Sequence, residues 1–268
     1  MSQEKNHVYE FWERASCGEE LYLSGHEIDH YRAQADIRYS LEPYIPGFAG
    51  FRNAGGLRVL EIGVGLGADH LRFAEAAEEV WGIDLTERAI AHTRRRLAAF
   101  GLSSNLAVGD AECLDFSDAS FDLVYSWGVL HHSPDTPTAI DEVWRVLKLG
   151  GKAKIMIYHK WSLIGFMLWV RYALLGLKPW LSLREIFARY MESPGTKAYS
   201  VAEARKLVGR FSEVHIRTVL THGDLLESGA GQRHRGPLLT VAQRLWPRWL
   251  IRRFLSNAGL FMLIEAKK

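Results

Sequence analysis

At residues 59–70, VLEIGVGLGADH, an apolar run leads into a glycine-rich turn. A turn of this kind between a strand and a helix lets the backbone approach a ligand closely. Gly63, Gly65 and Ala68 fit the G-x-G-x-x-G/A pattern of dinucleotide-binding loops, but the acidic Glu61 is not part of that pattern. The turn therefore predicts a nucleotide site without identifying the nucleotide.

Short apolar strands and longer helices alternate through most of the chain. The expected strands are residues 57–62, 79–84, 106–110, 121–126, 152–158, 213–220 and 259–268. Strands that alternate with helices of ten or more residues imply right-handed crossovers and a mostly parallel sheet. We therefore predict an α/β fold with a Rossmann-like, doubly wound sheet.

The alternation also predicts how the chain is organised. With 268 residues, 48% of them hydrophobic, the chain suits one α/β domain with elaborations. Residues 1–56 are expected to be mostly helical, and residues 57–268 to form the α/β domain. The regular pattern breaks at about 159–199 and again at about 221–258, where we expect insertions that cap the domain.

Charge and cysteine content exclude several classes of protein. The net charge of +2 gives no overall signal for nucleic-acid binding, so we expect no nucleic-acid partner. Two cysteines far apart in the sequence fit a reducing cytoplasm better than a disulfide scaffold. The polar, acidic N-terminus does not resemble a signal peptide. We therefore expect a cytoplasmic location.

The composition of two segments within the insertions does not identify what these segments contact. Residues 161–177 are apolar but too short for a transmembrane helix, and residues 237–255 mix Leu and Trp with Arg and contain no acid. This composition is compatible with an anionic membrane surface, and equally with packed helices whose arginines face solvent. A homo-oligomer contact is a further alternative for residues 161–177.

Three acidic residues at the ends of successive strands narrow down the nucleotide. Glu61 would repel a pyrophosphate but would attract the ammonium and sulfonium of S-adenosylmethionine. Asp84, at the end of the second strand, suits ribose hydroxyls, although it could simply cap the next helix. Asp110 follows the third strand, at the edge where doubly wound sheets bind ligands. A nicotinamide-dependent oxidoreductase remains a remote alternative, because we find no Tyr-x-x-x-Lys or similar constellation in the later half of the chain.

Taken together, VLEIGVGLGADH, VWGIDLT (residues 80–86) and residues 109–158, which include GVLHHSPD, resemble a class I S-adenosylmethionine-dependent methyltransferase. The resemblance is to the broad group that contains ubiquinone and menaquinone C-methyltransferases and natural-product enzymes. It implies seven strands in the order 3-2-1-4-5-7-6, with the last strand antiparallel, and a helical N-terminal lid over the cofactor. By position it implies cofactor contacts from Glu61, Gly63, Gly65, Gly67, Asp84, Leu85, Asp110, Ala111, Glu112, Ser126 and Trp127, with no metal.

The catalytic requirement is modest, because a methyl group on a sulfonium is already activated. The protein must mainly align the acceptor and exclude water, and a base helps only when the acceptor carries a proton. His131 is our candidate for a side chain near the methyl group, although His131 and His132 could instead only fix the shape of their loop. The acceptor is expected to be a small apolar or aromatic molecule, methylated on carbon, oxygen or nitrogen. One alternative acceptor is a quinone or polyprenyl-type lipid, methylated by a peripheral membrane enzyme. One alternative function is binding of the cofactor without methyl transfer.

Overall fold

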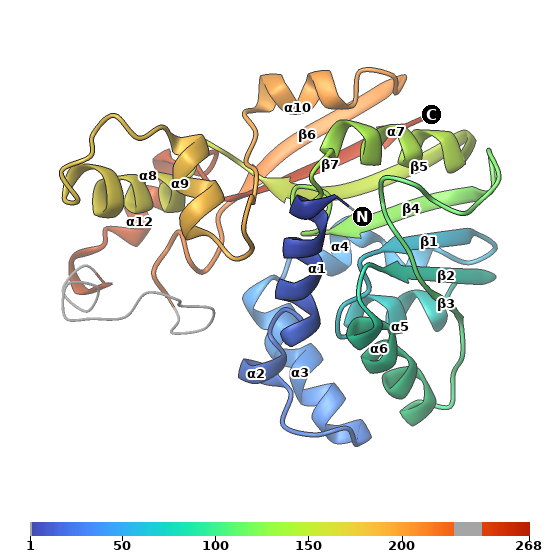
Figure 1. Ribbon diagram of the computed structural model, residues 1–268. Coiled ribbons are helices and arrows are strands. Elements are labelled where there is room, and N and C mark those ends of the chain that lie inside the picture. The colour runs from blue at the N-terminus through green and yellow to red at the C-terminus, as the bar shows by residue number, and fades with distance from the viewer. Residues whose placement is uncertain (1, 228–242) are drawn as a thin grey trace.

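The computed structural model describes residues 2–227 and 243–268 and contains a seven-stranded sheet in the order β3-β2-β1-β4-β5-β7-β6 (Figure 1). The strands are β1 (Arg58–Ile62), β2 (Glu79–Asp84), β3 (Asn105–Val108), β4 (Phe121–Trp127), β5 (Leu147–Tyr158), β6 (Glu213–Val219) and β7 (Phe261–Lys267). Strand β7 pairs antiparallel with β5 and β6, and the other neighbours pair parallel. The predicted fold class, strand order and antiparallel last strand are confirmed.

Helices cover both faces of the sheet, with α5 and α6 on one side and α7 and α10 on the other (Figure 1). Their bounds are α5 (Ala68–Ala74), α6 (Glu87–Ala99), α7 (Thr136–Val146) and α10 (Val201–Leu207). Because successive side chains of a strand point to opposite faces of the sheet, each strand contributes to a hydrophobic core on both faces. In β4, Val124 packs with Ile140 of α7, whereas Tyr125 packs with Phe73 of α5. The doubly wound architecture follows from this alternation.

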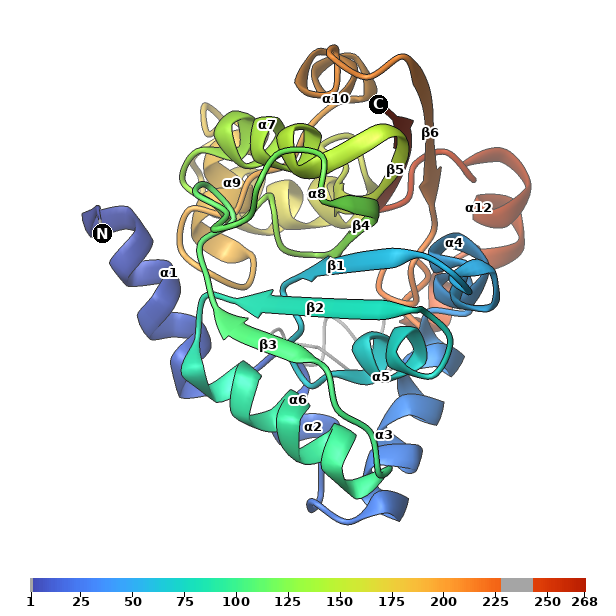
Figure 2. The ribbon, with the colours of Figure 1, turned by 90° about the vertical axis from the view of Figure 1, so that its right-hand side faces the viewer.

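The N-terminal residues form helices. They are α1 (Gln3–Arg14), α2 (Glu19–Tyr22), α3 (Ile28–Leu41), α4 (Ile45–Ala49) and the short 3-10 helix η1 (Phe51–Asn53). The hydroxyl of Ser2 caps α1 by accepting the backbone N–H of Lys5. In Figure 2, β1, β2 and β3 point toward α1, so this helix lies across the carboxyl edge of the sheet.

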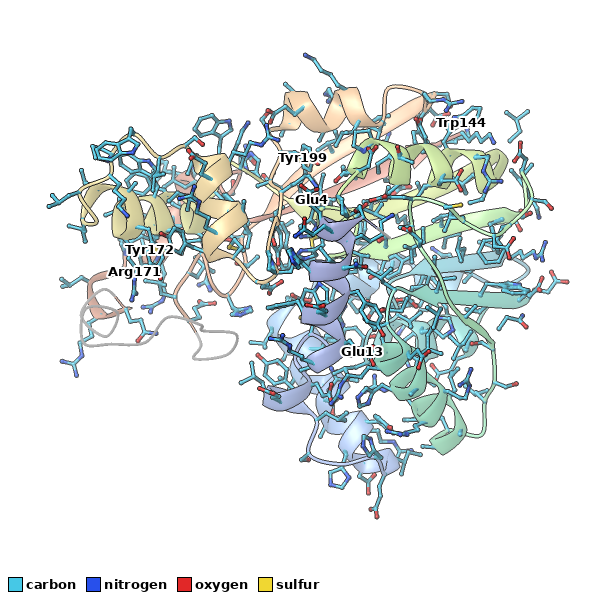
Figure 3. The ribbon with its side chains drawn as sticks, in the orientation of Figure 1. Glu4, Glu13, Trp144, Arg171, Tyr172 and Tyr199 are labelled. Atoms are coloured by element: carbon cyan, nitrogen blue, oxygen red, sulfur yellow. The ribbon has the colours of Figure 1, made fainter. Side chains whose placement is uncertain are left out.

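The described parts of the two insertions form a lobe beside the sheet (Figure 1). After β5 come α8 (Leu163–Trp169), the π-helical turn η2 (Val170–Leu174) and α9 (Leu183–Tyr190), and before β7 comes α12 (Arg248–Phe254). Figure 3 shows Arg171 and Tyr172 on this lobe, at the opposite end of the molecule from Trp144. The predicted segment 237–255 lies partly outside the described residues, which resume at residue 243.

The predicted start of the fifth strand was wrong. The fifth strand begins at Leu147 rather than Lys152, because Gly150 and Gly151 do not form a separating turn. Instead, the N–H of Gly150 and the carbonyl of Gly151 both hydrogen-bond to the backbone of Lys268, which extends the pairing. At the start of α7 the Asp135 carboxylate caps the helix by accepting the N–H of Thr138 at 3.1 Å.

Candidate cofactor and acceptor site

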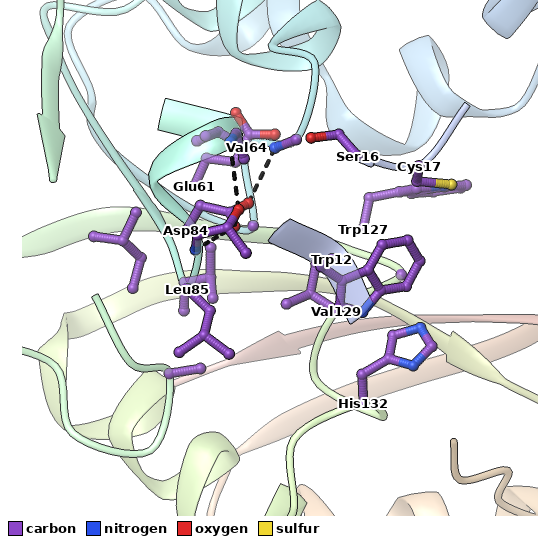
Figure 4. Close-up of a pocket in the computed structure, with 18 of the residues that line it drawn as sticks. Trp12, Ser16, Cys17, Glu61, Val64, Asp84, Leu85, Trp127, Val129 and His132 are labelled. Atoms are coloured by element: carbon purple, nitrogen blue, oxygen red, sulfur yellow. Dashed lines mark hydrogen bonds between the residues drawn. The ribbon is translucent and has the colours of Figure 1, made fainter. Parts of the chain in front are cut away.

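A cavity opens at the carboxyl edge of the sheet, between the ends of β1 to β4 and the N-terminal helices (Figure 4). The predicted cofactor residues that line it are Glu61, Gly63, Gly65, Gly67, Asp84, Leu85, Asp110, Ala111, Glu112 and Trp127. Ser126 does not line the cavity. It is fully buried, and its hydroxyl donates to the carbonyl of Ile62 at 3.1 Å, which ties β4 to β1 behind the cavity wall.

The glycines of the first turn serve two different purposes. Gly63 and Gly67 have φ of +85° and +73°, and there is no room for a side chain at either position. A Cβ on Gly63 would lie 2.1 Å from Val129 Cγ2, and one on Gly67 would lie 2.8 Å from Thr93 Oγ1. Gly65 has φ of +51°, but a Cβ there would meet nothing within 4 Å. Its backbone therefore faces open space in the cavity wall, as a closely approaching ligand requires.

Glu61 is a buried acid with a neutral hydrogen-bond partner. Its Oε2 lies 2.9 Å from His70 Nδ1, while His70 Nε2 lies 2.7 Å from the Ser104 hydroxyl. Burial lowers the pKa of His70 to about 4, so the imidazole is neutral and carries a single proton that its two nitrogens do not share. Burial and the nearby charge of Asp69 raise the pKa of Glu61 well above its usual value. A cation placed beside Glu61 would stabilise its ionised form.

Asp84 connects the first two strands at the cavity. Its carboxylate accepts the N–H of Gly65 at 3.2 Å, and the N–H and hydroxyl of Thr86 at 3.0 and 2.8 Å (Figure 4). Thr86, not Asp84, is the N-cap of α6, because its hydroxyl accepts the N–H of Ala89. Asp84 is therefore held at the cavity wall by the turn itself, with oxygen lone pairs left for a ligand.

An ion-pair cluster fastens α1 over the loop that follows β3. Lys5 Nζ lies 2.5 Å from Asp110 Oδ2 and 2.5 Å from Glu112 Oε2. The other oxygen of Glu112 accepts the hydroxyl of Ser133 and the N–H of Asp135. Lys5 was not identified from the sequence, because nothing in a polar, amphipathic helix marks one lysine as a partner for residues a hundred positions away.

A second cluster holds α3 against the start of α5. Arg38 donates to both oxygens of Asp69, at 3.2 and 2.7 Å, and the hydroxyls of Tyr39 and Tyr125 donate to the same carboxylate. Burial alone would raise the pKa of Asp69, but the Arg38 guanidinium outweighs it and the pKa is lowered. Arg38 also lies 3.6 Å from Glu42 and lines the cavity.

The other end of the cavity is lined mainly by aromatic and apolar side chains. Its aromatic, apolar and sulfur-bearing lining residues are Trp12, Cys17, Trp127, Met156, Tyr158 and Phe261. Two carboxylates, Glu42 and Glu192, line the cavity as well. Neither stood out in the sequence, because Glu192 lies in the loop after α9 and Glu42 at the end of α3, outside any motif.

Only one of the two adjacent histidines of the GVLHHSPD loop lines the cavity. His132 lines the cavity, while His131 is fully buried and does not line it. The His131 ring lies 4.0 Å from the ring of Tyr158, and neither of its ring nitrogens has a hydrogen-bond partner in the described structure. The structure therefore places His132, rather than the predicted His131, where it could meet a ligand.

Residues 59–151, which run from β1 through the glycine-rich turn into β5, match the family described as "Methyltransferase domain". These residues supply most of the cavity wall described above. Residues 59–151 are therefore a methyltransferase domain of the class I S-adenosylmethionine-dependent type. The cofactor of this family is S-adenosylmethionine, and the open backbone at Gly65, the buried Glu61 and the exposed lone pairs of Asp84 fit that group.

Sequence relatives match this methyltransferase over part of its length. It is 36% identical over 107 residues to phosphoethanolamine N-methyltransferase 2 of Caenorhabditis elegans, and this match covers 39% of this chain and 24% of that enzyme. It is 34% identical over 106 residues to phosphatidylethanolamine N-methyltransferase of Cereibacter sphaeroides, covering 39% of this chain and 52% of that enzyme. The chain thus matches only about a quarter to a half of these relatives.

A structural relative supports the same fold. The Haemonchus contortus phosphoethanolamine N-methyltransferase 2, in complex with phosphomonomethylethanolamine and S-adenosylhomocysteine, superposes with a TM-score of 0.60. The sequences are 17% identical, and the match covers 97% of this methyltransferase and 60% of that chain. Within the described residues, no group of three His, Cys, Asp or Glu side chains could hold a metal ion, and no helix is long and apolar enough to cross a membrane.

Proposed function

We propose that this methyltransferase transfers the methyl group of S-adenosylmethionine to a small-molecule acceptor held in the same cavity. One observation carries the proposal. A continuous cavity joins the acidic glycine turn to an end lined by Trp12, Trp127, Tyr158 and Phe261. Two ligands can then meet inside one enclosure, as an in-line displacement requires.

The roles of the predicted cofactor residues follow from their places on the wall. We assign Glu61 to the methionyl ammonium, Asp84 to the ribose hydroxyls, and the loop at residues 110–112 to the adenine. Leu85 and Trp127 supply apolar contacts. The cofactor brings an activated methyl group, so the chain contributes binding, alignment and exclusion of water. Helix α1 helps to exclude water, because Lys5 fastens it across the cavity edge.

A thermal-shift titration tests the cofactor assignment directly. S-Adenosylhomocysteine should raise the melting temperature, and NADH should leave it unchanged, because Glu61 repels a pyrophosphate. The reverse pattern would support a nicotinamide-dependent oxidoreductase instead. Formation of S-adenosylhomocysteine from S-adenosylmethionine with added acceptors then distinguishes methyl transfer from binding alone.

The acceptor is proposed to be apolar or aromatic in part, and not a phosphate ester. Aromatic side chains form much of the acceptor end of the cavity. Among the described residues, the cationic side chains on the cavity wall are Lys5 and Arg38, and each already pairs with two carboxylates. The phosphate of phosphoethanolamine, on which the nematode relative acts according to its name, would therefore lack a free cation within this part of the chain. Phosphoethanolamine should be a poor acceptor for this chain.

A second candidate function is methylation of a lipid-like acceptor at a membrane surface. The lobe of α8, η2 and α12 exposes large apolar side chains: Trp161 63%, Phe166 59%, Leu175 62%, Leu177 82%, Trp180 75%, Trp249 69% and Phe254 67%. No Asp or Glu occurs at residues 160–184 or 243–264, whereas Lys160, Arg171, Lys178, Arg252 and Arg253 do. Exposed apolar groups among cations suit an anionic bilayer surface.

Flotation with vesicles tests this second candidate. The chain should float with phosphatidylglycerol vesicles and less with phosphatidylcholine vesicles, and Trp249→Ser combined with Phe254→Ser should reduce flotation. Leu149→Ser is the matched control, since Leu149 is 89% exposed in β5, outside the lobe. No flotation at low salt, or loss of a dimer rather than of flotation in the double variant, would contradict the membrane assignment.

A further inference from the structure

Three polar side chains meet at the acceptor end of the cavity, apart from the proposed cofactor contacts. Tyr158 donates its hydroxyl proton to Glu192 Oε2 at 3.0 Å, and the same oxygen lies 3.9 Å from His132 Nε2. All three residues line the cavity. The Glu192 side chain is 44% exposed, whereas that of His132 is 5% exposed. The carboxylate is therefore open to a ligand, and the imidazole is fixed beside it.

The hydrogen-bond network assigns the tautomer of His132. Thr196 donates its only hydroxyl proton to the carbonyl of Ser193 at 2.7 Å, so it must accept in its 3.1 Å contact with His132 Nδ1. Nδ1 therefore carries the proton, which also faces the Ser193 hydroxyl at 2.7 Å. Burial lowers the pKa of His132 to about 3, so the ring is neutral. Nε2, which has no hydrogen-bond partner, must then present a lone pair.

Within this group of three side chains, Glu192 and His132 offer hydrogen-bond acceptors to a ligand, and the one hydroxyl donor is already used. The proton of Tyr158 is already donated to Glu192, which leaves the lone pairs of Glu192 Oε2 and His132 Nε2 facing each other across 3.9 Å. One ligand nitrogen at a normal hydrogen-bond distance of about 2.9 Å can reach both atoms. A hydroxyl carries one proton and can satisfy only one of them, whereas an ammonium carries enough for both.

We propose that this end of the cavity binds the protonated amine of the acceptor, and that Glu192 receives its proton before methylation. The inference deepens the proposed function and rests on it. It identifies nitrogen as the methylated atom and Glu192 and His132 as the groups that contact it.

The other groups near Glu192 agree with a cationic ligand. The thiol of Cys17 lines this end of the cavity, and burial raises the pKa of Glu42 to about 7. Arg38, the positive side chain beside Glu42, is held by Asp69 at 2.7 Å. The aromatic rings that line this end of the cavity provide faces that attract an ammonium.

The chemical step balances with these groups alone. The ammonium gives one proton to the Glu192 carboxylate, which acts as the base. The freed nitrogen lone pair forms the bond to the methyl carbon. The carbon–sulfur bond breaks, and its electron pair stays on sulfur, which becomes a neutral thioether. The proton on Glu192 passes to solvent when the product leaves.

Matched amine and alcohol probes test the inference on the full chain saturated with S-adenosylhomocysteine. Binding of benzylamine against benzyl alcohol, and of tyramine against tyrosol, is measured by calorimetry at neutral pH. In wild type the amine of each pair should bind at least about tenfold more tightly. Glu192→Gln should remove that preference and leave alcohol binding unchanged, because the glutamine side chain keeps the shape but not the charge. Glu78→Gln, an exposed carboxylate away from the cavity, is the control and should behave as wild type.

The outcomes separate this inference from the proposed function. Failure of the wild type to bind S-adenosylhomocysteine would overturn the proposed function itself. If S-adenosylhomocysteine binds, three results would overturn the amine site. The alcohols bind as tightly as the amines or more tightly, neither class binds at millimolar concentration, or the preference for the amine survives in Glu192→Gln. Unchanged affinity of Glu192→Gln for S-adenosylhomocysteine, with an unchanged melting temperature, shows that the variant is folded.

Discussion

The carboxylate of Glu61 lies 2.9 Å from Nδ1 of a neutral His70 and makes no ion pair with a lysine or arginine in the described structure. The folded protein thus holds a buried acid whose natural counter-charge is absent until a cationic ligand binds. Burial of such a group without a counter-charge costs stability, and binding of a cation recovers it.

Glu61→Gln should therefore stabilise the cofactor-free protein while weakening cofactor binding. The pKa of Glu61 is raised in the folded state, so the unfolded chain loses this proton at a lower pH. Glu61 consequently destabilises the fold increasingly as pH rises above about 4.3, and the glutamine removes this effect. We expect a higher melting temperature at pH 7, by about 2–4 °C for each kcal/mol gained, and roughly 10- to 100-fold weaker binding of S-adenosylmethionine.

The same residue makes cofactor binding depend on pH in a definite direction. Because the ammonium favours ionised Glu61, binding releases a proton, and affinity should rise with pH through the raised pKa of the free protein. Calorimetry in two buffers of different ionisation enthalpy measures the released proton. A wild type that takes up protons, or a Glu61→Gln variant that releases as many as the wild type, would contradict the assigned role of Glu61.

The sequence predicted the fold and the cofactor end of the cavity because both depend on local patterns. Alternating apolar strands, the turn at residues 63–67 and the acids at strand ends are each visible within a few residues. The acceptor end could not be predicted in this way, since Glu42 and Glu192 come from the N-terminal segment and an insertion that only the tertiary fold brings to one cavity. The sequence also could not show that His132 rather than His131 lines the cavity, because two adjacent residues in an irregular loop give no periodicity that tells which one faces inward.

Gly63→Ala and Gly65→Ala should separate folding from ligand binding. Both residues have positive φ, so each alanine costs about 1 kcal/mol in backbone strain. At Gly63 the new Cβ also collides with Val129, so we expect roughly 2–4 kcal/mol lost in chemical denaturation. At Gly65 the methyl group meets no protein atom, so the stability loss stays near the strain cost, while affinity for S-adenosylhomocysteine falls about tenfold or more. Equal stability of the two variants would contradict this division.

Lys5→Met should loosen helix α1 without disturbing the sheet. The lysine is largely buried between Asp110 and Glu112, and its loss leaves these two carboxylates adjacent without a cation. We expect S-adenosylhomocysteine to dissociate roughly three- to tenfold faster in stopped-flow measurements, equivalent to about 0.7–1.4 kcal/mol, and residues 3–14 to exchange amide hydrogens faster. Lys148→Met is the matched control, because Lys148 pairs with Asp122 in strands β5 and β4, outside the cavity. Identical dissociation rates for the two variants would show that α1 does not cover the cofactor.

His131→Leu should preserve activity and stability, in contrast to His132→Leu. The His131 ring is fully buried, and neither nitrogen has a hydrogen-bond partner in the described structure, so an apolar side chain of similar size removes two unsatisfied polar atoms. Its melting temperature should equal or exceed that of wild type. His132→Leu removes the partner of the buried Ser193 hydroxyl and the lone pair on the cavity wall, so both stability and methyl transfer should fall. A large loss of turnover in His131→Leu, with cofactor affinity intact, would return the catalytic role to His131.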